Sequence, residues 1–244
     1  MLAPVMNQDP SRFSKQIQKM FGAIAPRYDL LNCLLSCGRD KYWRKVAVNS
    51  LAPKPGDRFL DLATGTADVA LEIADRDPSN IKVVGVDFSY EMLALGKVKI
   101  RARNLEKSIE LQSGAAENLA FANGTFNGII TAFGIRNFSD IDRGLQEMWR
   151  VLKLKGKVVI LEFSLPNNIL FKMAYRIYFD FILPMIGRIV SGHQSAYSYL
   201  PQSVWEFPSP SEFVQMMKDN GFQDVAFKNL TFGIATVYTG HKYA

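Results

Sequence analysis

The feature that most constrains this chain is a regular alternation of strand-like and helix-like segments that begins at Arg58. Short runs rich in valine and isoleucine indicate buried strands, whereas apolar residues spaced by three and four indicate helices. Because crossovers between parallel strands are right-handed, the alternation predicts an α/β fold with a doubly wound, mainly parallel sheet. The seven expected strands are 58–63, 82–87, 109–112, 126–132, 158–163, 225–230 and 234–239, with helices at 67–74, 89–105, 141–152 and 209–221.

Two segments depart from this alternation. Residues 11–50 carry apolar side chains at helical spacing, interrupted at Pro26, and predict an N-terminal helical cap. Residues 166–207 are rich in aromatic residues and methionine and predict a helical insertion after the fifth strand. With 244 residues and 48% hydrophobic content, the chain can bury one large core, so we expect a single domain over residues 1–244.

The chain is basic, with a net charge of +6. This charge suits a nucleic acid, an anionic membrane surface or an anionic ligand, and it does not choose among them. No signal peptide is expected, since residues 1–10 lack a basic region followed by a long apolar run. The most apolar stretch, 169–187, contains three charged residues and Pro184, which makes it a poor transmembrane span. We expect a cytoplasmic protein or one peripheral on the inner membrane face.

The cysteines and histidines do not suggest a metal site. Cys33 and Cys37 lie four residues apart, the spacing of one helical face, and the only histidines, His193 and His241, are distant in the sequence. A structural zinc site needs four ligands, so reduced thiols and no bound metal are expected.

A glycine-containing turn, Asp61 to Asp68 (DLATGTAD), follows the first expected strand. Such a turn lets a ligand approach the backbone at the carboxyl edge of a parallel sheet. Asp87 ends the next strand, where a carboxylate can accept hydrogen bonds from ribose hydroxyls. The dinucleotide fingerprint with three glycines is absent, which disfavours NAD. Two acids in the turn instead offer the negative field that a sulfonium prefers, favouring S-adenosylmethionine; the alternative is a plain strand-to-helix turn with solvated acids.

Several motifs extend this interpretation over nearly the whole chain. Residues 114–119 (GAAENL) and 150–153 (RVLK) resemble class I methyltransferases. More specific segments are 21–32 (FGAIAPRYDLLN), 133–137 (FGIRN), 161–166 (LEFSLP) and 197–200 (YSYL) with Ser203 and Val204. Together they are similar to the ubiquinone/menaquinone biosynthesis C-methyltransferase family, of the demethylmenaquinone methyltransferase type. The resemblance implies the class I methyltransferase fold, S-adenosylmethionine as methyl donor, and transfer to a ring carbon of a polyprenylated quinol.

The resemblance also implies a set of cofactor-binding residues: Asp61, Gly65, Thr66, Asp87, Ala115, Ala116 and Ala132. Some positions depart from the family pattern, with Ala67 in place of glycine, Ala132 in place of serine and Leu154-Lys155-Gly156 in place of Pro-Gly-Gly. Ala115 matters most, because the asparagine or aspartate of the family would help to hold the adenine. Backbone groups of Ala115 and Ala116 remain to read the adenine edge, and we expect weaker cofactor affinity.

Methylation of an aromatic carbon requires a neighbouring phenol to lose its proton. Arg136 and Asn137 follow the fourth strand. They are expected to stabilise the phenolate, because a guanidinium stays protonated and an amide can donate to the same oxygen. Tyr28, from the N-terminal helices, would complete the network, and Glu162 at the end of the fifth strand is the alternative as general base. The structural alternatives are a salt bridge for the arginine and packing alone for the tyrosine.

The segment 169–187 suits the other half of the substrate. Its charged residues share one helical stripe and its apolar residues cover the rest, which fits a polyprenyl tunnel, a bilayer surface or a core helix. The expected partners are a polyprenylated quinol and a membrane surface, without nucleic acid. A homodimer and the choice between naphthoquinol and benzoquinol stay open.

Three rival functions also stay open. A nucleic-acid methyltransferase suits the basic charge, although the Pro-Pro-aromatic motif of amino-group methylation is absent after the fourth strand. A non-catalytic member of a quinone-biosynthesis complex is suggested only by Ala115. A methyltransferase of another lipid, such as a sterol, would differ in its product.

Overall fold

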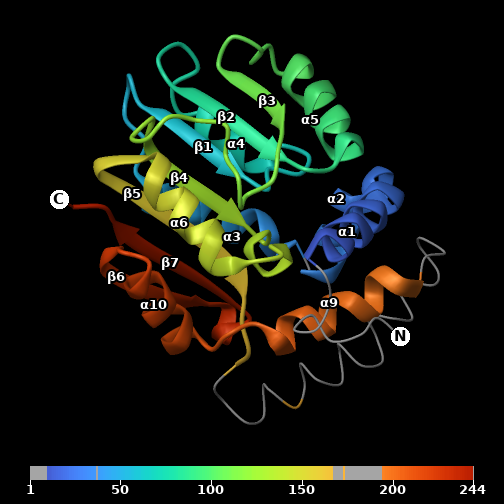
Figure 1. Cartoon of the computed structure of the whole chain (residues 1–244). Helices are drawn as coiled ribbons and strands as arrows, with labels where there is room; N and C mark the ends of the chain where they lie inside the picture. The colour runs from blue at the N-terminus through green and yellow to red at the C-terminus, as the bar shows by residue number, and fades with distance from the viewer. Residues whose placement is uncertain (1–9, 37, 167–172, 174–193, 244) are drawn as a thin grey trace.

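The computed structural model describes residues 10–36, 38–166, 173 and 194–243, which form a sheet with helices on both faces (Figure 1). The sheet has seven strands: β1 (Arg58–Leu62), β2 (Lys82–Asp87), β3 (Ile109–Ser113), β4 (Phe126–Ala132), β5 (Leu152–Phe163), β6 (Gln223–Leu230) and β7 (Ala235–His241). Their order is β3-β2-β1-β4-β5-β7-β6, and β7 is antiparallel to both of its neighbours. The predicted seven-stranded, mainly parallel α/β fold is confirmed. The strand order reverses between β1 and β4, the place where such sheets bind ligands.

β5 begins earlier than the sequence pattern predicts. The expected strand starts at residue 158, whereas β5 starts at Leu152, which pairs with Phe126 of β4. The register then shifts, so that Lys157 lies opposite Gly128. The stretch between these two pairs is irregular, and Lys155 within it has a left-handed backbone at φ 62°. Because this stretch alternates lysine with other residues, no apolar run marks it as strand.

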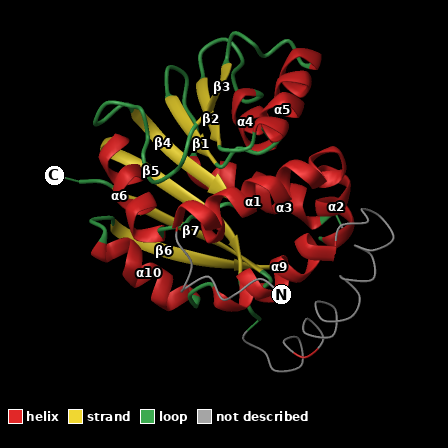
Figure 2. Cartoon of the chain, turned by 45° about the vertical axis from the view of Figure 1, so that its right-hand side comes forward, coloured by secondary structure: helices red, strands yellow, loops and turns green. Residues whose placement is uncertain are grey.

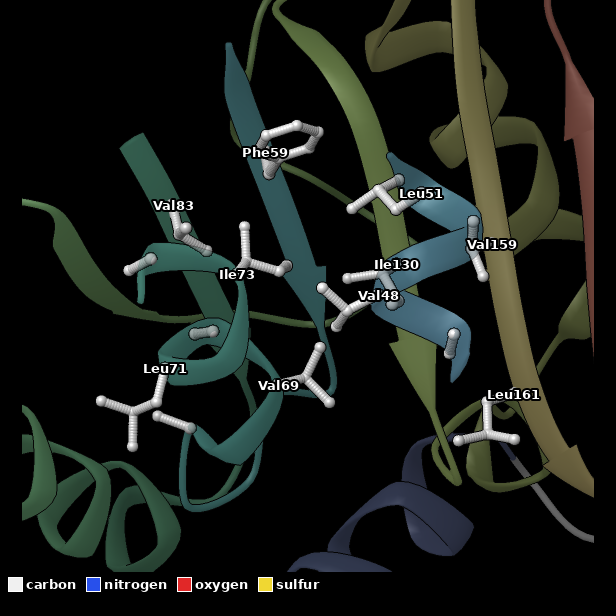
Figure 3. Packing of buried hydrophobic residues seen from close by; sticks show 14 of the residues in the cluster. Val48, Leu51, Phe59, Val69, Leu71, Ile73, Val83, Ile130, Val159 and Leu161 are labelled. Atoms are coloured by element: carbon white, nitrogen blue, oxygen red, sulfur yellow. The ribbon is translucent and has the colours of Figure 1, made fainter. Parts of the chain in front are cut away.

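Two hydrophobic cores lie on the two faces of the sheet. One face packs against α3 (Arg39–Leu51), α4 (Asp68–Ala74) and α5 (Tyr90–Ala102), and the other against α6 (Ile141–Val151) and α10 (Pro210–Asp219). Since side chains alternate along a strand, the neighbours Phe59 and Leu60 belong to different cores. Figure 3 shows the first core, in which Val48 and Leu51 of α3 and Val69 and Ile73 of α4 pack over Phe59, Ile130 and Val159.

The N-terminal helices lie beside the carboxyl ends of the parallel strands (Figure 1). α1 (Pro10–Ile24) and α2 (Tyr28–Leu35) are joined by the short 3-10 turn Ala25–Arg27, which contains Pro26. The proline ends α1 because it has no N–H to continue the helical hydrogen bonds. Of the cap expected over residues 11–50, α1 and α2 cover the edge of the sheet, whereas α3 packs against β4 and β5.

A helix from the expected insertion completes this cover. α9 (Gln194–Glu206) contacts α1, and the two helices are seen from different sides in Figures 1 and 2. Ile17 and Tyr199 are buried between them. The rest of the insertion expected over residues 166–207, including the segment 169–187, lies outside the described residues except for Met173. Within the described ranges, no helix combines the length and the apolar character that crossing a bilayer requires.

Candidate active site

The turn after β1 is built around Asp61. The Oδ2 atom of this fully buried carboxyl accepts hydrogen bonds from the Thr64 hydroxyl at 2.5 Å and the Ala70 amide at 3.0 Å. Its side chain therefore ties the start of the turn to the first residues of α4. Burial raises the pKa of Asp61 from 3.8 to about 7, and the two hydrogen bonds oppose that rise.

Gly65 forms the open part of this turn. Its φ is +55°, and a Cβ added there would have a single neighbour within 4 Å, the Tyr28 ring at 4.0 Å. The glycine thus leaves a space between the β1 turn and α2 that a side chain would fill. Its amide donates to Oδ2 of Asp87, at the end of β2, over 2.8 Å. The Oδ1 atom of Asp87 accepts the Ser89 amide at 2.9 Å, so this buried carboxylate joins the ends of two strands.

A cavity occupies this part of the carboxyl edge. Seven residues that the sequence predicts for the site line it: Tyr28, Gly65, Asp87, Ala115, Ala116, Ala132 and Asn137. Further lining residues that the sequence argument did not single out include Phe21, Phe88, Met92, Glu117, Phe133 and Phe138. Phe21, Glu117 and Phe133 lie in or beside the family motifs, which is the one signal that could have indicated them. Asp61, Thr66 and Arg136 do not line the cavity.

Thr66 belongs instead to a polar network that holds the cap. Its hydroxyl donates to Asp29 of α2 at 2.7 Å and accepts from Lys99 of α5 at 2.8 Å. Lys99 also forms ion pairs with Asp29 and Asp68, each at 2.6 Å. Arg44 lies 3.4 Å from Asp68 as well. The charge of Asp68 is therefore compensated by two cations, which weakens the negative field expected from it.

Arg136 does not line the cavity and lies in the short helical turn Ile135–Asn137 that follows β4. Its Nη1 donates to Oε1 of Glu162 and to the Phe133 carbonyl, both at 2.6 Å. The side chains of Arg136 and Glu162 are 6% and 0% exposed. Burial raises the pKa of Glu162, and the arginine beside it opposes that rise. The buried Nε of Arg136 has no hydrogen-bond partner in the described part of the chain.

Close contact between two strand ends positions this turn. A Cβ added to Gly134 would lie 2.5 Å from the Cβ of Ala63 in the β1 turn, so only glycine fits. The preceding residue, Phe133, has a φ of 58°, which is strained for a bulky side chain. Its ring packs 4.5 Å from that of Phe163. Strained backbone of this kind persists where the surrounding packing over-determines it, and such places are often functional sites.

Asn137 and Tyr28 are the two predicted catalytic residues that reach the cavity. Burial raises the pKa of Tyr28, so the phenol stays protonated and can donate. Asn137 Oδ1 accepts a hydrogen bond from the Tyr199 hydroxyl of α9 at 2.9 Å. Tyr199 was not predicted for the site, although it lies in the YSYL motif. Over the described ranges, no group of three or more His, Cys, Asp or Glu side chains is placed to hold a metal ion.

Solved structures that resemble this one support the fold. The [4+2]-cyclase SpnF matches with a TM-score of 0.71 at 16% identity, over 95% of this chain and 97% of that one. A Haemonchus contortus phosphoethanolamine N-methyltransferase 2 in complex with S-adenosyl-L-methionine matches with a TM-score of 0.63 at 16% identity, over 82% of this chain and 52% of that one. At such identities the likeness concerns the fold alone.

Proteins related by sequence share a much higher identity with this chain than these solved structures do. The ubiquinone/menaquinone biosynthesis C-methyltransferase UbiE of Geotalea daltonii is 52% identical over 93% of this chain and 97% of the relative. The demethylmenaquinone methyltransferase of Deinococcus radiodurans is 46% identical over 93% of this chain and 92% of the relative. The model of the ubiE/COQ5 methyltransferase family matches residues 10–242. The family resemblance predicted from the motifs is confirmed, and this chain belongs to the ubiE/COQ5 methyltransferase family.

Proposed function

We propose that this chain transfers a methyl group from S-adenosylmethionine to a ring carbon of a polyprenylated quinol. The reaction converts demethylmenaquinol to menaquinol, or carries out the corresponding benzoquinol step of ubiquinone synthesis. The observation that carries the proposal is one cavity that joins the turns at Gly65 and Asp87 with Tyr28 and Asn137. Close relatives bearing UbiE and demethylmenaquinone methyltransferase names support the same chemistry.

The direct test offers short-tailed demethylnaphthoquinol and the matching benzoquinol to the purified chain, each with S-adenosylmethionine. Mass spectrometry of the product should find a new methyl group on a ring carbon. A methyl group on oxygen, or methylation of a sterol or a nucleic acid in place of both quinols, would contradict the proposal.

The residues around the cavity fit S-adenosylmethionine, which supplies an electrophilic methyl group on a sulfonium when bound. Gly65 lines the cavity and has no Cβ, so its backbone is accessible to a ligand there. Asp87 accepts the Gly65 amide on Oδ2 and the Ser89 amide on Oδ1, and it lines the cavity, where its carboxylate can also accept from ribose hydroxyls. Ala115 and Ala116 line the same cavity, where their backbone groups can meet the adenine edge. We assign Asp61 and Thr66 to holding the β1 turn and the cap, and not to direct contact with the cofactor.

Asp87→Ala is expected to weaken S-adenosylmethionine binding by roughly 1.5–3 kcal/mol, the scale of lost hydrogen bonds to a charged group. The dissociation constant should therefore rise about 10- to 100-fold when measured by calorimetry. Glu110→Ala, at an exposed acid on the neighbouring strand β3, is the matched control and should bind normally. An unchanged constant for the Asp87 variant would remove Asp87 from the cofactor site.

Tyr28 and Asn137, which line the same cavity, act on the quinol. Loss of a phenolic proton makes the neighbouring ring carbon nucleophilic, and the N–H and O–H donors of Asn137 and Tyr28 stabilise the oxygen that becomes negative. The positive charge of Arg136, which precedes Asn137 in the chain and does not line the cavity, favours the same phenolate at a distance. A guanidinium is a poor proton acceptor, so proton removal is not assigned to Arg136. Glu162 is enclosed and already accepts bonds from Arg136 and the Phe163 amide, so we assign proton removal to water.

We also propose that the chain binds anionic membranes reversibly, because the segment 169–187 is apolar and the net charge is +6. Sedimentation with anionic vesicles at low salt should bring the chain into the pellet, and added salt should release it. Lys172→Glu with Arg176→Glu should weaken binding about tenfold or more. The control pair Lys153→Glu with Lys155→Glu changes the net charge equally at exposed residues of β5 and should have less effect. Complete retention of the unmodified chain in the supernatant would contradict the proposal.

A further inference from the structure

Asn137 has a defined orientation in the wall of the cavity. Its carboxamide makes two hydrogen bonds in the described part of the chain: Nδ2 donates to the Phe133 carbonyl at 3.4 Å, and Oδ1 accepts from the Tyr199 hydroxyl at 2.9 Å. A carbonyl oxygen can only accept, so the amide nitrogen must face Phe133. Oδ1 must then face Tyr199, whose hydroxyl is the donor.

We infer that Tyr199 is a positioning residue, which holds Asn137 so that an amide N–H is presented to the substrate oxygen in the cavity. The Nδ2 atom carries two hydrogens, and only one is directed to Phe133. Asn137 lines the cavity, and its second hydrogen has no acceptor in the described part of the chain, which leaves it for a ligand there. If the carboxamide were flipped, Oδ1 would meet the Phe133 carbonyl and would repel a phenolate. This inference rests on the proposed function, because it is the quinol that offers an oxygen of this kind.

The surroundings of Tyr199 make it suited to this task. The residue is 4% exposed and packs against Ile17 of α1, so its ring is fixed between two helices of the cover. Burial raises the pKa of Tyr199 to about 12, and its hydroxyl therefore remains a donor at any pH at which the enzyme would be assayed. Since Tyr199 lies on α9 and Asn137 follows β4, the hydrogen bond also links the docking of α9 to the geometry of the catalytic turn.

The test compares Tyr199→Phe with the unmodified enzyme, using a short-tailed demethylnaphthoquinol and S-adenosylmethionine. Removing only the hydroxyl should lower kcat about 5- to 10-fold, the effect of one neutral hydrogen bond. The KM for the quinol and the dissociation constant of S-adenosylmethionine should stay within twofold, because Tyr199 does not line the cavity. Tyr238→Phe removes another buried tyrosine hydroxyl, in the core next to Phe213, and should leave kcat unchanged.

A double-variant comparison separates positioning from general destabilisation. In an Asn137→Ala background, Tyr199→Phe should have no further effect on kcat, since it acts through Asn137. An equal fall in both backgrounds, or a kcat within twofold of the unmodified enzyme for Tyr199→Phe alone, would overturn the inference. Absence of C-methylated product from the unmodified enzyme with either quinol would overturn the proposed function itself, which distinguishes the two failures.

Discussion

Arg136→Ala is expected to lower kcat by about 10-fold while leaving the affinity for S-adenosylmethionine nearly intact, less than the roughly 100- to 1000-fold lost with a direct donor, because Arg136 does not line the cavity and is paired with Glu162. The reaction creates negative charge on a phenolic oxygen. A fixed cation therefore stabilises the transition state more than the ground state, because the charge is larger there. Arg136 lies outside the lining of the cofactor cavity, so its loss should not alter the cofactor's contacts. Both quantities are to be measured on folded protein with a short-tailed quinol. Arg136→Lys keeps the charge and loses the planar set of donors, so it should recover only part of the activity.

The ion pair with Glu162 requires a control for folding. Arg136→Ala leaves a fully buried carboxylate without its cation, and breaking a buried pair in this way costs roughly 3–5 kcal/mol of folding free energy. In the double variant Arg136→Ala with Glu162→Gln, no unpaired charge remains, so stability should largely return. If turnover returns with it, Arg136 has a structural role alone. A kcat near that of the unmodified enzyme, or a cofactor affinity that falls as far as kcat, would lead to the same conclusion.

The sheet could be predicted from the sequence because its signal is local. Apolar runs such as 82–87 and 126–132 mark buried strands, and the residues that follow parallel strands meet at one edge whatever their separation in the chain. Gly65, Asp87 and Asn137 come together for that reason. The start of β5 could not be predicted, because Leu152 is strand only through its pairing with Phe126.

Partners within the site could not be predicted, because they depend on contacts between distant elements. The motif around Arg136 favours a cation at the edge of the sheet. It does not show that Glu162, 26 residues later, accepts a hydrogen bond from the Nη1 atom of Arg136. Tyr199 and Asn137 are 62 residues apart and meet because α9 docks against α1 and against the turn Ile135–Asn137. Likewise, the turn at Asp61 suggests a carboxylate open to a ligand, whereas the structure turns it inward to Thr64 and the Ala70 amide.

The inward direction of Asp61 makes the stability of the fold depend on pH. Its carboxyl is fully buried, and its Oδ1 has no hydrogen-bond partner within the described ranges, so ionisation is costly. Because the pKa is about 7 in the folded chain and 3.8 ordinarily, the folded state binds the proton more tightly than the unfolded state. Protonation of Asp61 therefore adds to the free energy of unfolding. This contribution is fully present below about pH 4 and is lost as the pH rises to about 7. The difference between the two pKa values corresponds to a change of about 4 kcal/mol in the free energy of unfolding.

Asp61→Asn removes this titration while keeping an oxygen that can accept from Thr64 and the Ala70 amide. Between pH 5 and pH 8, the free energy of unfolding of the variant should therefore gain roughly 2–3 kcal/mol relative to the unmodified chain. Urea unfolding at the two pH values measures this difference. Asp87 and Glu162 are also buried acids with raised pKa values and are present in both proteins, and the charge of Asp87 adds to the rise at Asp61, so the comparison reports Asp61 together with its coupling to Asp87. Asp219→Asn, at an exposed carboxyl of α10, is the control and should change stability equally at both pH values. If the difference in unfolding free energy between Asp61→Asn and the unmodified chain is the same at pH 5 and pH 8, Asp61 does not hold its proton in the folded state, and its burial does not make the stability of the fold depend on pH.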